Sequence, residues 1–408
     1  MTEESKPPVE DTSPATEERP PPDDWVAAIT GAGTSAGKAL LIPSLALLTA
    51  LIFGAIFIAL TDVDAWRAWS DSPGDALSMM WTSVSDAYVA LFRGSIGSVN
   101  AISETLFSAT PLIIAGLAVA IGFQAGLFNI GVNGQMHMGG LAAIYVAFTW
   151  SLPTVIHIPL ILLGAVIGGA IWGGIPGLLR AKTGAHEVIT TIMLNFIALF
   201  FVDYVLTTSF FQEPGRLDPI SKAAETTAQF PKILGSGFRL NIGFLVALAL
   251  VFFVYWLLFR SSIGFEFRAV GSNPDAAKFA GMSVVFALVA VMAISGALGG
   301  LAGANQILGL PPYRATTNFA ATIGFDAIAL ALLGRSHPFG VLWAGILFGA
   351  LRAGGRAMQG DAGIPIDLVL VVQALIIVFI AAPGLVRAIY RLKGPEEEAT
   401  QLTKGWST

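Results

Sequence analysis

The chain has 408 residues, of which 55% are hydrophobic and 12% charged, and its net charge is −5 at pH 7. Soluble domains carry about 25% charged residues, so this composition excludes a water-soluble enzyme and a nucleic-acid-binding module with a basic face. The absence of cysteine excludes disulfides, thiolate metal sites and a cysteine nucleophile. The composition indicates a chain whose surroundings are largely lipid.

The acidic charge is concentrated at the N-terminus. Residues 1–27 hold eight acidic and two basic side chains, and they are rich in proline and poor in large apolar residues. Such composition is typical of disorder. We therefore predict a disordered acidic, proline-rich cytoplasmic tail over 1–37, a transmembrane domain over 38–390 and a cytoplasmic tail over 391–408.

The apolar segments predict an all-α, polytopic membrane helix bundle. A bilayer crossing needs about 20 mostly apolar residues. Ten segments qualify, of which the eighth is short: 39–60, 105–124, 128–150, 157–179, 188–210, 241–260, 283–306, 322–334, 339–355 and 365–386. The even count and the distribution of Lys and Arg favour both termini inside. A less apolar piece, Ala76 to Phe92, adds an uncertainty of one span, because it suits either the membrane surface or the side of the bundle.

Glycines at helical spacing predict close packing of the fourth and seventh spans. Small residues one turn apart allow helix backbones to approach. The fourth span carries Gly164, Gly168, Gly169, Gly173 and Gly177, and the seventh carries Gly296, Gly299, Gly300 and Gly303.

Two apparent catalytic motifs fail on inspection. Residues 32–39 read AGTSAGKA, but Ala39 stands where a P-loop needs Ser or Thr for magnesium. His186 and Glu187 begin like a zinc-protease helix, but Thr190 stands where the second His would be. The sequence therefore offers no site for ATP or metal, and no catalytic residues.

Polar residues inside the spans are the better candidates, because each is costly in lipid. Asn129, Asn133 and Gln135 lie among glycines at 126–135, and Asp326 lies in the short span 322–334. Glycine-broken helices at membrane depth are tolerated where they are buried or line a cavity. The amides therefore either bond neighbouring helices or line a pathway, and Asp326 either caps a broken helix or lines it.

Three further polar residues lie in apolar runs, namely Asn195, Asp203 and Asp367, and a structural role is the simpler interpretation of each. The two broken segments fall in the third and eighth spans, five apart. That offset gives them opposite directions across the bilayer, as in an inverted repeat.

The connection 260–282 predicts a short cytoplasmic helix. Ser272 or Asn273 would cap it, Pro274 would occupy its first position, and Gly281 would end it. Such a capped helix suits the docking of a partner, although an ordinary surface loop remains possible.

Four segments in order carry a family resemblance: GLFNIGVNGQMHMGG (126–140), GAHEVITTIMLNFIA (184–198), FRAVGSNPDAAKFAGM (267–282) and IGFDAIALALLGRSHPFGVLWAGILFG (323–349). Together they resemble the inner-membrane permeases of bacterial ABC importers of the ribose/branched-chain amino acid type. The second and fourth segments are most similar to the nucleoside branch, which depends on a basic membrane lipoprotein. His137, Met138 and the long acidic tail depart from the family pattern.

The resemblance implies a type II ABC importer permease with an inverted-repeat core, in the bacterial plasma membrane. It implies a cytoplasmic ABC ATPase that holds ATP and magnesium, a second permease of related sequence and an extracellular substrate-binding lipoprotein. It also implies that 261–282 is the segment that couples to the ATPase. The matching coupling residues are Arg268, Gly271, Ser272, Asn273, Ala276, Ala277 and Gly281.

The predicted function is the translocation of nucleosides or related ligands, powered by the separate ATPase. Asn129, Asn133, Gln135, Asn195, Phe325 and Asp326 are the candidate pathway residues, and Phe319 and Phe325 could stack on a base. The alternatives are a permease of the same family for ribose-type sugars and an ion-coupled carrier with Asp203 or Asp326 as its proton site. A membrane enzyme is least favoured, because no nucleophile–base pair is visible.

Overall fold

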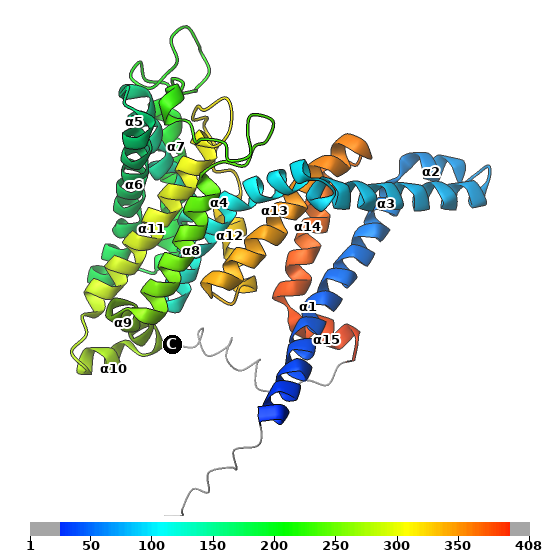
Figure 1. The fold of residues 1–408 in the computed structure, drawn as a ribbon, viewed down its shortest axis with the longest axis horizontal. Coiled ribbons are helices and arrows are strands. Elements are labelled where there is room, and N and C mark those ends of the chain that lie inside the picture. The colour runs from blue at the N-terminus through cyan, green and yellow to red at the C-terminus, as the bar shows by residue number, and fades with distance from the viewer. Residues whose placement is uncertain (1–24, 392–408) are drawn as a thin grey trace, which may run out of the picture.

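The computed structural model describes residues 25–391, which form a bundle of helices (Figure 1). Within this range there are three isolated β-bridges and no strand, so the predicted all-α class is confirmed. Most of the predicted tails, 1–24 and 392–408, lies outside the described residues. The first described helix begins at Trp25, earlier than the predicted span at 39–60.

The helices follow one another with short connections, except at 207–242 and 309–322. In chain order they are α1 (Trp25–Thr61), α2 (Val63–Ala68), α3 (Pro73–Ile96), α4 (Val99–Gln124), α5 (Val132–Thr149), α6 (Thr154–Thr183), α7 (Glu187–Leu206), the 3-10 turn η1 (Thr226–Ala228), α8 (Gly243–Arg260), α9 (Ser262–Ser272), α10 (Pro274–Phe279), α11 (Val284–Leu308), α12 (Ile323–Leu333), α13 (Pro338–Asp361), α14 (Ile366–Ala381) and α15 (Pro383–Ile389).

Each of the ten predicted spans overlaps one of these helices. Seven helices of the described range are long and apolar enough to cross a membrane, namely α1, α4, α6, α7, α8, α11 and α13. The other three fall short for two reasons. α5 carries the polar residues Asn133, Gln135 and His137, whereas α12 and α14 are short.

The two ends of the bundle differ (Figure 1). We call one the α10 end, because it carries α9 and α10 together with the start of α1 and α15. We call the other the loop end, because the connections 207–242 and 309–322 lie there. Both described ends of the chain therefore lie on the side that carries α10, which agrees with the predicted topology.

The segment between α1 and α4 forms an arm at the loop end. α3 lies crosswise over the ends of α1 and α14 and packs against α13 (Figure 1). The structure thus places the piece Ala76 to Phe92 in a helix against the bundle.

The core consists of two interlocked sets of helices, α4–α7 and α11–α14. α4 of the first set packs against α13 of the second, and α6 of the first packs against α11 of the second. α4 runs toward the α10 end, whereas α11 runs toward the loop end (Figure 1). Each set thus packs on the other, and the two sets run in opposite directions. This is the arrangement that the predicted inverted repeat requires.

Glycine seams hold these helix pairs together. A Cβ atom added to Gly169 on α6 would lie 2.9 Å from the Cα of Gly300 on α11, and one added to Gly173 would lie 2.8 Å from the Cα of Gly296. No side chain larger than hydrogen fits between such backbones. The close packing of the fourth and seventh predicted spans is therefore confirmed.

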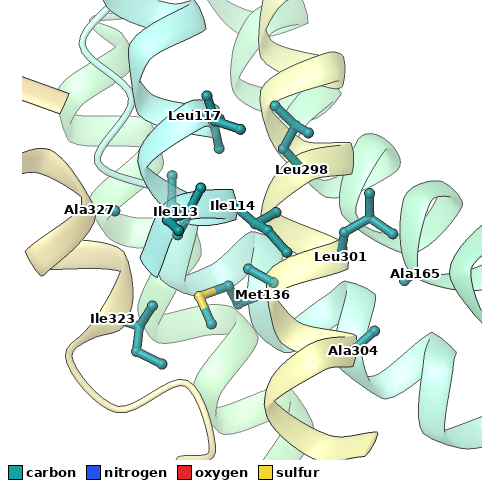
Figure 2. Close-up of a cluster of buried hydrophobic side chains, with 14 of the residues drawn as sticks. Ile113, Ile114, Leu117, Met136, Ala165, Leu298, Leu301, Ala304, Ile323 and Ala327 are labelled. Atoms are coloured by element: carbon teal, nitrogen blue, oxygen red, sulfur yellow. The ribbon is translucent and has the colours of Figure 1, made fainter. Parts of the chain in front are cut away.

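Apolar side chains fill the space between the two broken helices. Ile113, Ile114 and Leu117 of α4 meet Met136 of α5, while Ile323 and Ala327 of α12 close the other side (Figure 2). All of these side chains are almost completely buried. The packing fixes where α5 and α12 begin, and both carry candidate site residues.

Candidate functional site

The chain breaks between α4 and α5, and Asn129 fills the break. Asn129 is fully buried, and its Nδ2 donates to Ser295 Oγ of α11 (2.7 Å) and to Gln135 Oε1 (3.2 Å). Its Oδ1 accepts from the backbone N–H of Gly131 (2.8 Å) and from Gln135 Nε2 (3.3 Å). Ser295 Oγ in turn donates to the carbonyl of Ala118 in α4 (2.5 Å). The break is thereby tied to α4, α5 and α11.

Two more amides tie the start of α5 to its neighbours. Asn195 of α7 accepts from the N–H of Gly134 (2.7 Å) and donates to the carbonyl of Ile130 (2.9 Å). Asn133 donates to the carbonyl of Ala321 (2.8 Å) and accepts from the N–H of Gly324 (3.0 Å), which joins α5 to the beginning of α12. Both side chains are more than nine-tenths buried.

The four predicted amides are therefore brought together, and each of their side-chain polar atoms has a partner within the chain. A buried amide without partners would cost about 1–3 kcal/mol, so these bonds stabilise the helix break. Of the two interpretations left open by the sequence, bonding between helices describes their geometry in this conformation. Their role as pathway residues stays a prediction.

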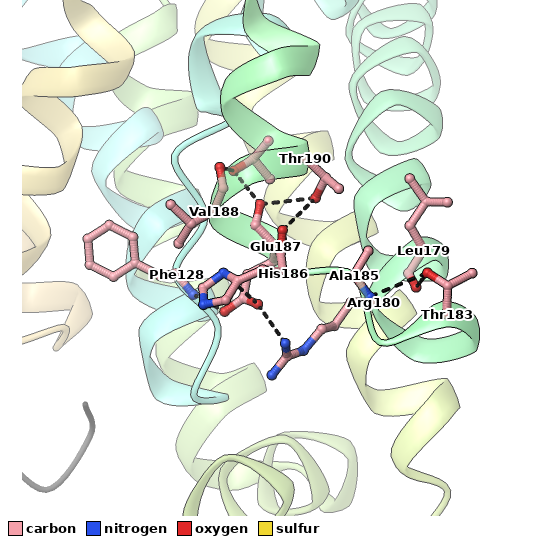
Figure 3. A network of polar contacts seen from close by, with 10 residues as sticks. Phe128, Leu179, Arg180, Thr183, Ala185, His186, Glu187, Val188 and Thr190 are labelled. Atoms are coloured by element: carbon pink, nitrogen blue, oxygen red, sulfur yellow. Dashed lines mark hydrogen bonds and ion pairs between the residues drawn. The ribbon is translucent and has the colours of Figure 1, made fainter. Parts of the chain in front are cut away.

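A buried carboxylate holds the same break from the α10 end (Figure 3). Glu187 begins α7, and its Oε2 lies 3.3 Å from Nη1 of Arg180 near the end of α6. Its Oε1 accepts from the backbone N–H of Phe128 at 3.4 Å. Sequence reasoning examined Glu187 only for zinc, and no group in the described part of the chain could hold a metal ion. The sequence signal that could have identified this ion pair was a carboxylate at the start of a helix that follows shortly after Arg180.

The segment 261–282, which the resemblance predicts to couple to an ATPase, contains the predicted short capped helix. Asn273 caps α10 through its Oδ1, which accepts from the N–H of Ala276 at 3.0 Å, and Pro274 is the first helical residue. Gly281 follows with φ +85°, a conformation that favours glycine. The capping prediction is confirmed for Asn273, while Ser272 ends α9. Arg268 packs over the ring of Phe259, 5.2 Å from its centroid.

The predicted coupling residues divide into an exposed and an inward group. Ser272, Asn273, Ala276 and Gly281 are exposed, and so is Phe279, whose side chain is 93% exposed. Ala277 is buried, and Gly271 packs against the backbone of the helix break between α4 and α5. A Cβ added to Gly271 would lie 2.7 Å from the backbone nitrogen of Gly126, and one added to Gly126 would lie 2.9 Å from the carbonyl oxygen of Gly271. Gly271 therefore joins α9 to the break instead of facing outward.

Phe325 and Asp326 lie apart from the amides, on an exposed face of α12. Phe325 is 50% exposed, and Asp326 pairs with Arg352 of α13. Thr322 Oγ1 donates to Asp326 Oδ2 at 3.1 Å. Sequence reasoning missed Arg352, because only the tertiary packing of α12 on α13 brings it to Asp326.

A second charged group lies on the neighbouring surface of α4 and α13. Glu104 Oε2 pairs with Arg239 Nη1 (2.9 Å) and with Arg356 Nη2 (3.2 Å). Arg356 also donates to Ser108 Oγ at 2.8 Å. Together with Asp326 and Arg352 these residues form what we call the charged face, which consists of Glu104, Arg239, Asp326, Arg352 and Arg356.

The remaining candidates lie elsewhere. Phe319 is buried and packs on the His137 ring, with centroids 4.9 Å apart, so its ring is not free in this conformation. Asp203 is exposed near the end of α7, and Asp367 is exposed at the start of α14. Neither of them is part of the break or of the charged face.

Comparison with known proteins assigns the fold to a family. The family model described as branched-chain amino acid transport system / permease component matches residues 101–381. The guanosine ABC transporter permease protein NupP of Bacillus subtilis is 37% identical over 86% of this chain and 95% of its own length. The nucleoside ABC transporter permease protein NupB of Lactococcus lactis is 34% identical over 90% and 97%, respectively.

A third relative has a different named substrate. The glucose ABC transporter permease protein TsgB13 of Haloferax volcanii is 38% identical over 75% of this chain and 83% of its own length. No solved structure gives a significant match. The match of the family model to most of the chain, the near-complete coverage of the relatives and the membrane-spanning helices agree with one another. The chain belongs to the branched-chain amino acid transport system permease family, and it is a multi-pass permease of an ABC transporter in the plasma membrane.

Proposed function

We propose that this chain is the permease subunit of an ABC importer that carries nucleosides into the cell. The observation that carries the proposal is the full-length match to two permeases whose names specify guanosine and nucleosides. In this proposal ATP and magnesium are held by a separate ATPase, so this chain itself binds no cofactor.

α10 is the element that docks on the ATPase in this proposal. An aromatic side chain that is 93% exposed on a short capped helix is unusual unless a partner covers it, and Phe279 is such a side chain. Asp275, Ala276 and Lys278 surround it and are exposed as well. The α10 end then faces the cytoplasm, which places both described chain ends inside.

The contact between Gly271 and Gly126 connects docking to transport. When the ATPases close, they move α10 and with it α9. The movement reaches the helix break at 125–131, which Asn129 and Glu187 tie to α4, α6, α7 and α11. A displaced break changes how these helices pack and so switches the opening of the pathway. The extracellular lipoprotein and a second, related permease complete the importer in this proposal.

The docking test uses Phe279→Glu, because its side chain touches little of this chain. Substitutions at Gly271 or Ala277 would strike the chain's own interior and could not separate docking from folding. We expect Phe279→Glu to reduce ATP-dependent uptake at least tenfold while the amount of permease in the membrane stays unchanged. The matched control is Phe265→Glu on α9, which is 56% exposed and lies outside α10. Normal uptake by Phe279→Glu would refute docking through α10.

The substrate test measures labelled guanosine uptake in cells with and without the gene. We expect loss of uptake on deletion, and competition by other nucleosides but not by ribose. The relative named for glucose supports a simple sugar as the second candidate substrate, so labelled ribose and glucose are measured in the same cells. Guanosine uptake that survives ATP depletion but stops when the proton gradient collapses would instead indicate an ion-coupled carrier.

A further inference from the structure

Four of the five residues of the charged face lie on helices of the membrane domain, and Arg239 lies in the connection 207–242 at the loop end. Arg352 stands nine residues before Asp361 at the end of α13, which corresponds to about 13 Å along the helix. Glu104 is the sixth residue of α4. A charged side chain that faces hydrocarbon at the centre of a bilayer costs about 3 kcal/mol. A cluster at this depth therefore needs water, protein or ligand beside it.

The chain alone does not bury this cluster. The side chains of Asp326 and Arg352 are 27% and 25% exposed, and that of Arg356 is 47% exposed. The cluster holds three guanidinium groups and two carboxylates, and Glu104 is shared by Arg239 and Arg356, so the cluster carries a net charge of +1. Hydrocarbon is the least favourable neighbour for such a surface, because it offers no hydrogen bonds to the exposed donors.

The amides at the break do not share this property. Asn129, Asn133, Gln135 and Asn195 are buried and bonded within the chain. The charged face, in contrast, keeps polar side chains of α4, α12 and α13 accessible, and Phe325 adds a half-exposed aromatic ring beside Asp326. Carboxylates accept hydrogen bonds from hydroxyl groups, guanidinium groups donate to them, and aromatic rings stack on planar bases.

We propose that the charged face and Phe325 form one wall of the permeation route, in which the Asp326–Arg352 pair binds ribose hydroxyl groups and Phe325 stacks on the base. The identity of the ligand rests on the proposed function, whereas the presence of water at this face does not. An uncharged nucleoside can replace water at the pair without bringing a charge into the membrane. The guanidinium and the carboxylate then serve as donor and acceptor for neighbouring hydroxyl groups.

The natural absence of cysteine makes water access directly measurable. Phe325→Cys and Phe200→Cys are expressed separately in the assembled transporter and treated in intact cells with a membrane-impermeant maleimide. Phe200 is 67% exposed on α7 and lies away from the charged face, so it is the matched control. We expect rapid labelling at position 325, at least tenfold slower labelling at position 200, and slower labelling at 325 in excess guanosine.

Each result decides the proposal. Labelling at position 325 no faster than at position 200 means that this face meets lipid or protein, and it overturns the proposal. Fast labelling at position 325 that excess guanosine does not slow, in cells that take up guanosine, means that the ligand does not bind at this wall. That result also overturns the proposal. If the cells take up no guanosine, the proposed substrate fails, and the labelling difference without ligand still decides whether the wall meets water.

Ligand recognition by the pair is tested through substrate selectivity. Guanosine and 2′,3′-dideoxyguanosine differ by the two ring hydroxyl groups, and the unaltered transporter is expected to prefer guanosine by about tenfold in KM. Asp326→Asn combined with Arg352→Gln should bring the two KM values within about twofold of each other. A purely structural pair would lower transport of both ligands equally and leave their ratio unchanged, which would refute recognition.

Discussion

The two broken helices of the core, α5 and α12, begin alike and end in different surroundings. Both start beside Asn133, which bonds to backbone groups at the start of α12 from its own place in the first turn of α5. α5 is then covered by α6, α7 and α11, whereas α12 packs mainly on α4 and α13 and has only a slight contact with α14. The two corresponding helices therefore differ in how far the chain covers them, and the less covered helix, α12, contributes Asp326 to the charged face.

α5, the more covered of the two helices, should tolerate no larger side chain on its buried faces. Gly139 of α5 lies where an added Cβ would be 2.8 Å from the carbonyl oxygen of Ala165, so Gly139→Ala must separate α5 from α6 and α11. We expect a loss of about 3 kcal/mol or more, seen as a lower melting temperature in detergent and a lower yield. Gly174→Ala is the control, since its nearest neighbour would be 4.0 Å away. Equal melting temperatures for the two variants would contradict the close packing.

Shortening an apolar side chain should also have different effects on the stability of α5 and of α12. Ile144 of α5 is fully buried, so Ile144→Ala should cost about 3 kcal/mol. Leu332 of α12 is 47% exposed, and Leu332→Ala should cost less than about 1 kcal/mol. Melting temperatures are compared in the assembled transporter. A large loss for Leu332→Ala there would show that another subunit covers α12 with apolar surface.

The Asp326–Arg352 pair should contribute a smaller amount. A double-mutant cycle with Asp326→Asn and Arg352→Gln isolates its coupling energy, and we expect about 1 kcal/mol because both side chains are partly exposed. The Arg180–Glu187 pair, whose carboxylate is buried, serves as the comparison and should couple more strongly. A stronger coupling at Asp326 would mean that the charged face is less open than its exposure indicates.

The smallest expected effect lies outside both sets of helices. Hydrogen bonds from Ser83 and from the N–H of Ala65 to Asp62 hold the pKa of that carboxyl below its ordinary value. The depressed pKa stabilises the folded chain above the ordinary pKa of an aspartate, and this contribution is lost as the pH falls through the folded value. Asp62→Ala should therefore reduce the free energy of unfolding at pH 7 by less than about 1 kcal/mol, seen as a slightly lower melting temperature. The difference from the unaltered chain should shrink as the pH falls below the ordinary aspartate pKa of about 4. A difference that is independent of pH would assign the effect to lost packing.

Local patterns in the sequence were sufficient for several features. Asn273, Pro274 and Gly281 predicted α10, because capping depends on residues within a few positions. Glycines among amides predicted the break before α5, and glycine spacing predicted the seam between α6 and α11. All of these are confirmed by the structure.

Features that need distant segments could not be predicted in this way. Whether Asn129 faces a neighbouring helix or a cavity depends on Ser295, which is 166 residues away. Arg352 reaches Asp326 only after α13 has packed on α12, and Gly271 meets Gly126 only after α9 has folded under α4. The sequence shows which side chains are polar, but their partners are decided by packing.

The contact between Gly271 and Gly126 has a mechanical consequence. Two backbones touch there with no side chain between them. Side chains are the part of an interface that can change rotamer and absorb a displacement, whereas peptide backbones in contact are stiff. In the proposed transport cycle, a shift of α9 would therefore be passed to the start of α5 with little absorbed at this contact. A side chain at either position would both separate the two backbones and add a flexible group between them, so the two glycines set the distance and the stiffness of the proposed coupling.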